Sequence, residues 1–250
     1  MQRRFPIWLT IWTVLGVALL VMLGNWQWQR LGEKEALLNG MRRQLSATPV
    51  ALPATPQTYL RVAVSGSYLT DKTVPVRATV AASEPGKSLG GLGFWWLVPL
   101  RLDDGRIVLV NRGFVPAKPD TRPPVIATPA GRQTVDGIVR APDYGNYFVP
   151  ADDPAHGEFF RRDPAALAGP LGLALAPAGP LQPFTIDALR SGDALRAPVG
   201  LDIASFIAAV PNNHLGYAFT WWGLALTLIG VYLAFLLSRR RRDGAPREPG

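Results

Sequence analysis

Two long apolar segments at opposite ends of the sequence constrain its fold most strongly. Residues 7–24 and 215–237 contain no charged side chain and are 18 and 23 residues long. A helix that crosses the hydrocarbon core of a bilayer needs roughly 17–25 such residues. We therefore predict two transmembrane helices that flank a domain of residues 25–214, in which no comparable apolar run occurs.

Positive charges beside the two segments predict the topology. Arg3 and Arg4 precede the first segment, and four arginines at 239–242 follow the second. Positively charged flanks stay in the cytoplasm, so we expect residues 1–6 and 238–250 to be cytoplasmic. Six residues leave no room for a mitochondrial transit peptide. The expected location is a bacterial inner membrane, with the central domain in the periplasm.

The first segment also has a feature of a secretory signal, because arginines precede it. A cleaved signal ends in small residues, whereas Leu23-Gly24 leads directly into residues 25–28, Asn-Trp-Gln-Trp. Tryptophan side chains favour the boundary between lipid and water. We therefore interpret the segment as a helix that remains in the membrane.

The net charge of +8 follows the topology and does not indicate nucleic-acid binding. Residues 1–24 carry two arginines, and residues 238–250 carry five arginines with Asp243 and Glu248, so these flanks contribute +2 and +3. Residues 25–237 hold 19 basic and 16 acidic side chains, which leaves +3. We expect the lipid bilayer, and no nucleic acid, as a partner.

The sequence contains no cysteine and only two histidines, His156 and His214. This composition argues against thiolate metal sites, iron–sulfur clusters, c-type haem attachment and multi-histidine metal sites. There is also no Gly-x-Ser-x-Gly or His-Glu-x-x-His motif, and glycine-rich residues 88–93 lack the helix and lysine of a phosphate-binding loop. We therefore predict that the protein is not an enzyme.

Between the two apolar segments, the sequence predicts a mostly antiparallel β domain with short helices. A helix continues out of the membrane to Leu45, and short runs rich in valine and aromatic residues then alternate with turn residues. The expected strands are residues 59–69, 73–80, 94–102, 107–115, 132–140, 159–160 and 184–186, with a short helix at 164–173. We expect a closed or partly closed barrel, with a sandwich as the alternative.

Two glycines in this domain predict local structure. Asp103-Asp104-Gly105 separates two of the expected strands, and Asp-Gly tolerates the positive φ angles of a tight hairpin turn. Gly66 lies inside the first expected strand, where glycine often marks a bulge or the close approach of another backbone. We expect a larger side chain at Gly66 to collide with its surroundings.

The start of the second apolar segment carries the strongest candidate binding site. Asn212 or Asn213 is expected to cap the helix. At helical spacing, His214, Tyr217 and Trp221 share one face at the outer boundary of the bilayer, where they can hold a planar aromatic ligand. The positive end of the helix dipole disfavours protonation of His214, so the imidazole stays neutral, as an axial haem ligand requires.

The alternative interpretation of these residues is an aromatic belt, in which tyrosine and tryptophan lie at the level of the lipid headgroups. Residues 26–30, Trp-Gln-Trp-Gln-Arg, occupy the same boundary after the first segment. They form either the opposite wall of a binding site or a second membrane anchor. The spacing alone leaves both alternatives open.

Motifs in order along the whole chain resemble the surfeit-locus-one family, called Shy-one in yeast. They are residues 26–30 with Lys34, the strand around Gly66, residues 99–100 and 110–116, Arg162-Asp163, and residues 212–215 with Tyr217, Thr220 and Trp221. The chain departs from the family pattern at Phe114 and around Phe159-Phe160, where tryptophan is usual. Both departures keep an aromatic side chain.

This resemblance implies an accessory role in the assembly of haem-copper cytochrome c oxidase, complex IV of the respiratory chain. It implies haem a as a transient cargo, with His214 as the candidate iron ligand. The implied partners are the catalytic subunit of the oxidase and, as a second candidate, haem a synthase. The alternative is a scaffold that binds only protein and stabilises an assembly intermediate. Two membrane spans and no catalytic cluster argue against a haem synthase.

Overall fold

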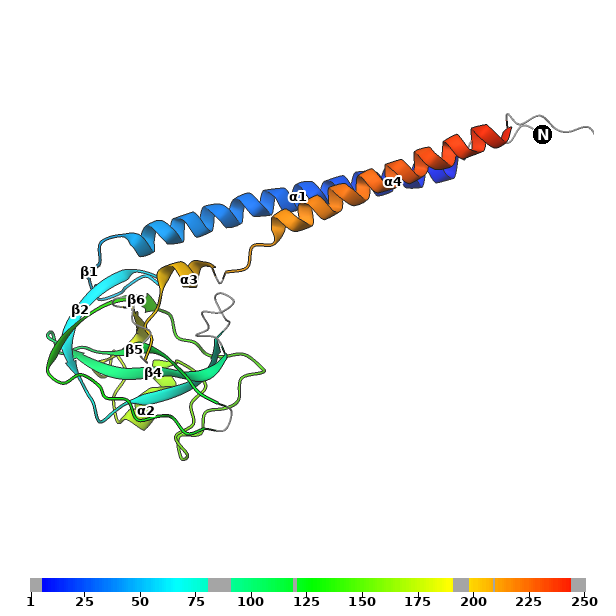
Figure 1. The fold of residues 1–250 in the computed structure, drawn as a ribbon. Coiled ribbons are helices and arrows are strands. Elements are labelled where there is room, and N and C mark those ends of the chain that lie inside the picture. The colour runs from blue at the N-terminus through cyan, green and yellow to red at the C-terminus, as the bar shows by residue number, and fades with distance from the viewer. Residues whose placement is uncertain (1–5, 81–90, 119–120, 191–197, 209, 244–250) are drawn as a thin grey trace, which may run out of the picture. The chain divides into compact units, whose positions relative to one another are not determined.

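A computed structural model describes residues 6–80, 91–118, 121–190, 198–208 and 210–243 (Figure 1). The chain divides into two compact units, Met1–Asn39 with Pro211–Gly250 and, separately, Gly40–Val210. Arg3, Arg4 and the first part of the glycine-rich stretch, residues 88–90, lie outside the described residues, as does the end of the basic tail, residues 244–250.

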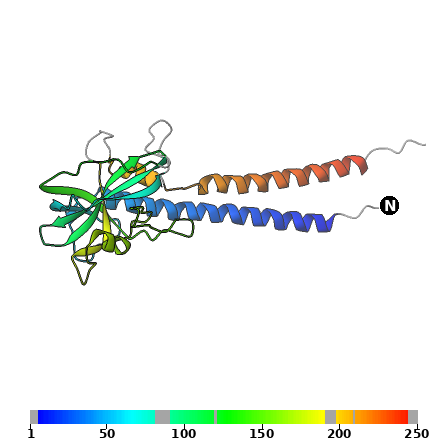
Figure 2. The ribbon, with the colours of Figure 1, turned by 90° about the horizontal axis from the view of Figure 1, so that it is seen from below.

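The first unit is built from two long helices. Helix α1 spans Ile7–Ser46 and helix α4 spans His214–Asp243. Both are long and apolar enough to cross a membrane, which confirms the two flanking apolar helices. Helix α1 runs without a break beyond residue 24, as expected. Figures 1 and 2 show the two helices side by side.

The two helices run antiparallel, because residues near the start of one contact residues near the end of the other. The Thr10 hydroxyl shares a hydrogen bond with the Tyr232 hydroxyl. At the other end of the pair, a Cβ atom at Gly24 would lie 2.3 Å from Nε1 of Trp222. Glycine at this position lets the Trp222 ring lie directly against α1, and a side chain here would force that ring to shift.

The second unit is a seven-stranded mixed sheet with two short helices (Figure 1). Its elements are β1 (Val50–Ala51), β2 (Arg61–Tyr68), β3 (Val74–Val80), β4 (Gly91–Leu102), β5 (Ile107–Pro116), β6 (Arg132–Arg140), α2 (Pro164–Leu171), β7 (Leu181–Ala188) and α3 (Ile203–Ala208). Neighbouring strands follow the order β1-β2-β6-β7-β5-β4-β3. The last strand in the chain therefore lies in the middle of the sheet.

The sheet differs from the closed form of the barrel that the sequence predicts. Most pairings are antiparallel, as predicted, but β1 pairs with β2 and β5 pairs with β7 in parallel. Strand β2 also meets β4 over Gly66–Tyr68, so the sheet curls back on itself there. This β2–β4 pairing covers only three residues of β2, while β1 pairs with Val62 and Ala63 of the same strand. The closed form of the prediction is therefore wrong, and the domain is a curled mixed sheet.

Most local elements agree with the sequence-based expectation. Strands β4 and β5 form the predicted hairpin, and Gly105 in its turn has a φ of 88°. The expected strand at residues 184–186 is part of the longer β7. Residues 159–160 do not form a strand, since Phe159 makes only an isolated bridge to Val76.

Gly66 lies where three strands meet. It is paired with Leu102 of β4 and, on its other side, with Gln133 of β6. A Cβ atom at Gly66 would lie 2.1 Å from the carbonyl oxygen of Arg101, which is much closer than any real contact. The predicted close approach of another backbone is confirmed.

The core of this domain includes two large apolar clusters and a smaller one formed by Phe94, Trp96, Val98 and Val115. One large cluster lies within the curled sheet and contains, among others, Val62, Leu100, Val110 and Ile186. The other large cluster packs helix α2 against the sheet, and Leu167 is fully buried there beside residues of β3, β4, β5 and β7. Burial of these apolar side chains holds the domain together without a disulfide.

Candidate functional site

His214 is the first residue of helix α4, and its imidazole is held by a residue of helix α1. The distance from His214 Nδ1 to Gln27 Oε1 is 2.7 Å. Pro211 lies three residues before the start of the helix. The imidazole is partly buried. This contact joins the two helices through residues that are 187 positions apart in sequence.

The expected asparagine cap is not found. Neither Asn212 nor Asn213 makes a side-chain hydrogen bond to the first turn of α4 in the described part of the chain. The carbonyl of Asn213 instead accepts from the backbone N–H of Tyr217, and Oδ1 of Asn212 is buried without a partner. The free N–H groups at the helix start are therefore not covered by these side chains.

Aromatic rings pack between the two helices close to this histidine. The ring centroids of Trp28 and Trp222 are 5.9 Å apart, with an angle of 39° between the planes. Phe219 meets Trp222 edge-on, with ring centroids 5.9 Å apart. Sequence reasoning named Trp221 and passed over Trp222, because spacing from His214 alone does not reveal which of two adjacent tryptophans faces the other helix.

The three predicted site residues lie in one continuous helix. At about 100° per residue, Trp221 lies about 20° from His214 around the α4 axis, and Tyr217 lies about 60° away. Tyr217 is 55% exposed. Among the described residues, neither Tyr217 nor Trp221 makes a ring contact or side-chain hydrogen bond. Of the three predicted site residues, only His214 therefore has a side-chain partner, Gln27.

The donor set at His214 fits a single axial bond to haem iron. An amide oxygen only accepts hydrogen bonds, so a neutral His214 in this contact has its proton on Nδ1 and keeps the lone pair of Nε2 available. No group of three or more acidic, histidine or cysteine side chains within the described ranges could enclose a free metal ion. The site therefore suits a metal-containing ligand that already supplies most of the donor atoms to its own metal ion.

His156, the other histidine, is in a different chemical environment. Its Nδ1 lies 2.6 Å from a carboxylate oxygen of Asp153 in an exposed loop. This hydrogen bond raises the pKa of His156 above its ordinary value. The carboxylate of Asp153 also accepts a hydrogen bond from the backbone N–H of Ala155, so these contacts stabilise a surface turn.

In the mixed-sheet domain, the family-like motifs meet at a buried carboxylate that sequence reasoning did not single out. Asp187 of β7 is 5% exposed and accepts from Nδ2 of Asn111 at 2.9 Å. Arg162 and Arg140 lie 3.3 and 3.5 Å from the same carboxylate. Buried charges require such partners. Asp163 accepts from the first turn of α2, so these motif residues have structural roles.

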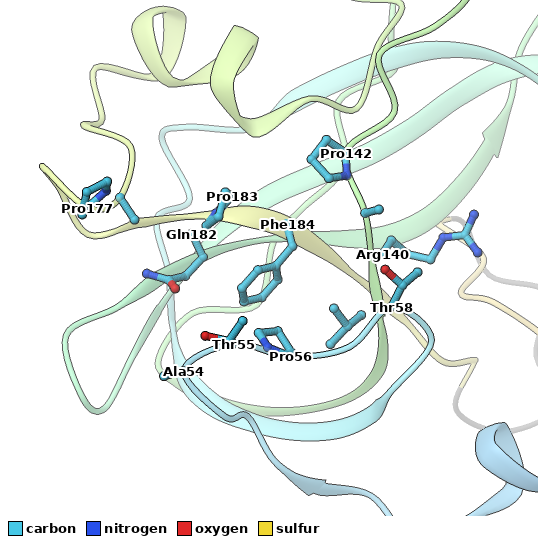
Figure 3. A pocket seen from close by; sticks show the side chains of 13 residues that line it. Ala54, Thr55, Pro56, Thr58, Arg140, Pro142, Pro177, Gln182, Pro183 and Phe184 are labelled. Atoms are coloured by element: carbon cyan, nitrogen blue, oxygen red, sulfur yellow. The ribbon is translucent and has the colours of Figure 1, made fainter.

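A pocket of about 440 Å³ opens between the loop after β1 and the ends of β6 and β7 (Figure 3). Phe184 forms part of its wall, facing Thr55 and Pro56 (Figure 3). Prolines and small residues make up most of the lining, and it contains no histidine or acidic residue. This pocket therefore offers no axial ligand for haem iron.

The fold and the candidate site together define a protein with a mixed-sheet domain between two apolar helices, one of which presents a single available imidazole. The chain belongs to the SURF1 family, whose profile matches residues 14–226. Members of this family are known generally as cytochrome oxidase assembly factors, not as catalysts.

Similar proteins come from distant organisms. A SURF1-like protein of Monosiga brevicollis is 30% identical and covers 95% of this chain and 92% of its own length. Surfeit locus protein 1 of Takifugu rubripes is 29% identical over 87% of this chain and 92% of its own length. A SURF1-like protein of the bacterium Rickettsia bellii is 28% identical over 86% of this chain and 85% of its own.

Proposed function

We propose that this protein is an assembly factor of the bacterial inner membrane that holds haem a through His214 and hands it to the catalytic subunit of haem-copper cytochrome c oxidase. The observation that carries the proposal is the hydrogen bond between Gln27 and His214 in a chain of the SURF1 family. In the neutral imidazole, this hydrogen bond leaves Nε2 available for a ligand, in a helix pair suited to a membrane.

The chain's own residues orient the imidazole and provide apolar surface beside it. When bound, haem a supplies the iron and the redox chemistry that the oxidase later uses. Tyr217 and Trp221 of α4 are proposed to contact the porphyrin, since flat aromatic side chains pack well against a planar ligand. Haem a synthase is the proposed donor and the oxidase catalytic subunit the proposed acceptor.

The antiparallel helix pair supports a topology with both termini in the cytoplasm. The hydrogen bond between Thr10 and Tyr232 brings the start of α1 to the end of α4 that carries Arg239. We expect a reporter at either terminus to behave as cytoplasmic and one inserted after His156 to behave as periplasmic. Alkaline phosphatase and green fluorescent protein fusions measure this, and a periplasmic C-terminal reporter would contradict the topology.

Deleting the gene tests the proposed function directly. We expect haem-copper oxidase activity in membranes to fall severalfold, while respiration through branches that do not use this oxidase is unchanged. The protein purified from cells that make haem a should carry haem, as measured by its reduced-minus-oxidised spectrum. Equal loss in both respiratory branches, or purification without haem, would contradict the proposal.

The second candidate, a scaffold that binds only protein, is favoured by one exposed loop of the outer domain. Tyr147 and Phe148 are 96% and 88% exposed and pack edge to face with ring centroids 5.6 Å apart. Exposed paired aromatic side chains are typical of protein-binding surfaces. Normal oxidase assembly in a His214→Ala strain, with loss of assembly in a Tyr147→Ser, Phe148→Ser strain, would favour this scaffold.

A further inference from the structure

Gln27 is the residue through which helix α1 acts on His214. Its Oε1 lies 2.7 Å from His214 Nδ1. In the portion of the chain that the structure describes, no other side chain hydrogen-bonds to this imidazole. Any control over the orientation or protonation of the ring by a side-chain hydrogen bond therefore comes from this one amide.

The chemistry of the contact determines where the imidazole proton is. A glutamine carbonyl oxygen has lone pairs but no hydrogen, so it only accepts. A neutral imidazole without a partner can carry its proton on either nitrogen. The hydrogen bond therefore selects the form with hydrogen on Nδ1, in which Nε2 is the nitrogen able to bind a metal.

The surrounding packing keeps Gln27 within reach of His214. Gly24 lies about one turn earlier on α1 and allows Trp222 of α4 to approach closely. Trp28, the next residue after Gln27, packs against the same tryptophan with ring centroids 5.9 Å apart. Contacts on both sides of Gln27 thus set the distance between the helices. The amide of Gln27 is not needed to hold the helices together.

We propose that Gln27 is a positioning residue, which fixes His214 as the Nδ1–H form and presents Nε2 to haem iron. This inference rests on the proposed haem-holding function. An outer hydrogen-bond acceptor of this kind makes the ligating nitrogen more basic, and losing such a partner typically weakens metal affinity about 10- to 100-fold. Gln27 therefore tunes how tightly a transient cargo is held.

The apo-protein provides a test that does not depend on haem. The full chain, labelled with ¹⁵N-histidine and placed in lipid nanodiscs at about pH 8, contains only two imidazoles, His156 and His214. A His156→Asn variant assigns the signals. We expect the ¹⁵N spectrum of His214 to show the Nδ1–H form in the wild-type protein and a shift toward Nε2–H in Gln27→Leu.

Two further variants separate positioning from general damage to the helix. Gln27→Glu keeps an acceptor and should keep the Nδ1–H form. Gln29→Leu is the matched control, since Gln29 lies about 200° from Gln27 around α1 and should leave the spectrum unchanged. A wild-type Nε2–H signal, an unchanged signal in Gln27→Leu, or a shift in Gln29→Leu as large as that in Gln27→Leu would overturn the proposal.

Titration of the same proteins with ferric haem links the inference to the function. We expect affinity to fall about 10- to 100-fold in Gln27→Leu and to be largely retained in Gln27→Glu and Gln29→Leu. If His214→Ala binds haem as well as the wild-type protein does, the proposed function loses its site, whatever the ¹⁵N spectrum shows. If His214→Ala loses haem while Gln27→Leu binds normally, only the role of Gln27 is refuted.

Discussion

Replacing Gly66 by glutamate is expected to abolish folding of the mixed-sheet domain, with a loss of more than about 4 kcal/mol in the free energy of unfolding. The Cβ atom alone would lie 2.1 Å from the carbonyl oxygen of Arg101 and 2.9 Å from the Cα of Leu102. Both obstacles are backbone atoms in a strand pairing, so they cannot rotate away. A carboxylate held among paired strands would add the cost of a poorly solvated charge.

Limited proteolysis and the amount of protein in isolated membranes measure this effect. Gly66→Ala separates size from charge, and it should also be strongly destabilising because the first added carbon already collides. Gly40→Glu is the control, since a Cβ at Gly40 in helix α1 would meet nothing within 4 Å. Wild-type protease resistance of Gly66→Glu would show that β2 and β4 separate more easily than their pairing indicates.

Replacing His214 by alanine is expected to remove the low-spin haem spectrum while the protein still accumulates. The change deletes the only nitrogen at this site that can ligate iron but leaves the apolar helix α4 intact. The loss of haem affinity should exceed the roughly 10- to 100-fold typical of losing an outer-shell partner. Absorption spectra and pyridine haemochrome assays of purified protein, with immunoblots for abundance, provide the measurement.

Trp221→Leu is the informative comparison for the alanine variant. Trp221 lies on nearly the same side of α4 as His214, and leucine preserves an apolar side chain while removing ring area. Haem occupancy should fall with the spectral shape preserved, because axial ligation remains. Unchanged haem content and spectrum in His214→Ala would assign this histidine to an aromatic belt and place the ligand elsewhere.

Features encoded over a few neighbouring residues were predictable from the sequence. The turn at Asp103-Asp104-Gly105 specifies its own hairpin, and the two apolar segments specify their own helices because length and lack of charge suffice. Gly66 was also identifiable, since a glycine inside a valine-rich strand has few explanations other than crowding. For the turn and the two helices the cause lies within the segment itself, whereas Gly66 marks crowding whose source, the backbone of Arg101, lies in another strand.

Features that depend on a distant partner were not predictable. Nothing within residues 181–188 indicates a parallel pairing with β5, and so the mixed sheet was missed. Asp187 looks like an ordinary polar residue until Asn111 and Arg162 are brought to it. Gln27 was one member of an aromatic and polar run, and its role appears only when α4 lies against α1.

The central position of β7 has a consequence for how the domain forms during synthesis. Residues 181–188 are made last among the strands, yet they join β5 on one side and β6 on the other. Until they emerge, both neighbours present unpaired edges, which are prone to aggregation. Because long-range strand pairing is slow, the nascent chain stays vulnerable while the residues between β5 and the end of β7 are being made. Completion of the sheet therefore waits until residues 181–188 are available, late in the synthesis of the domain.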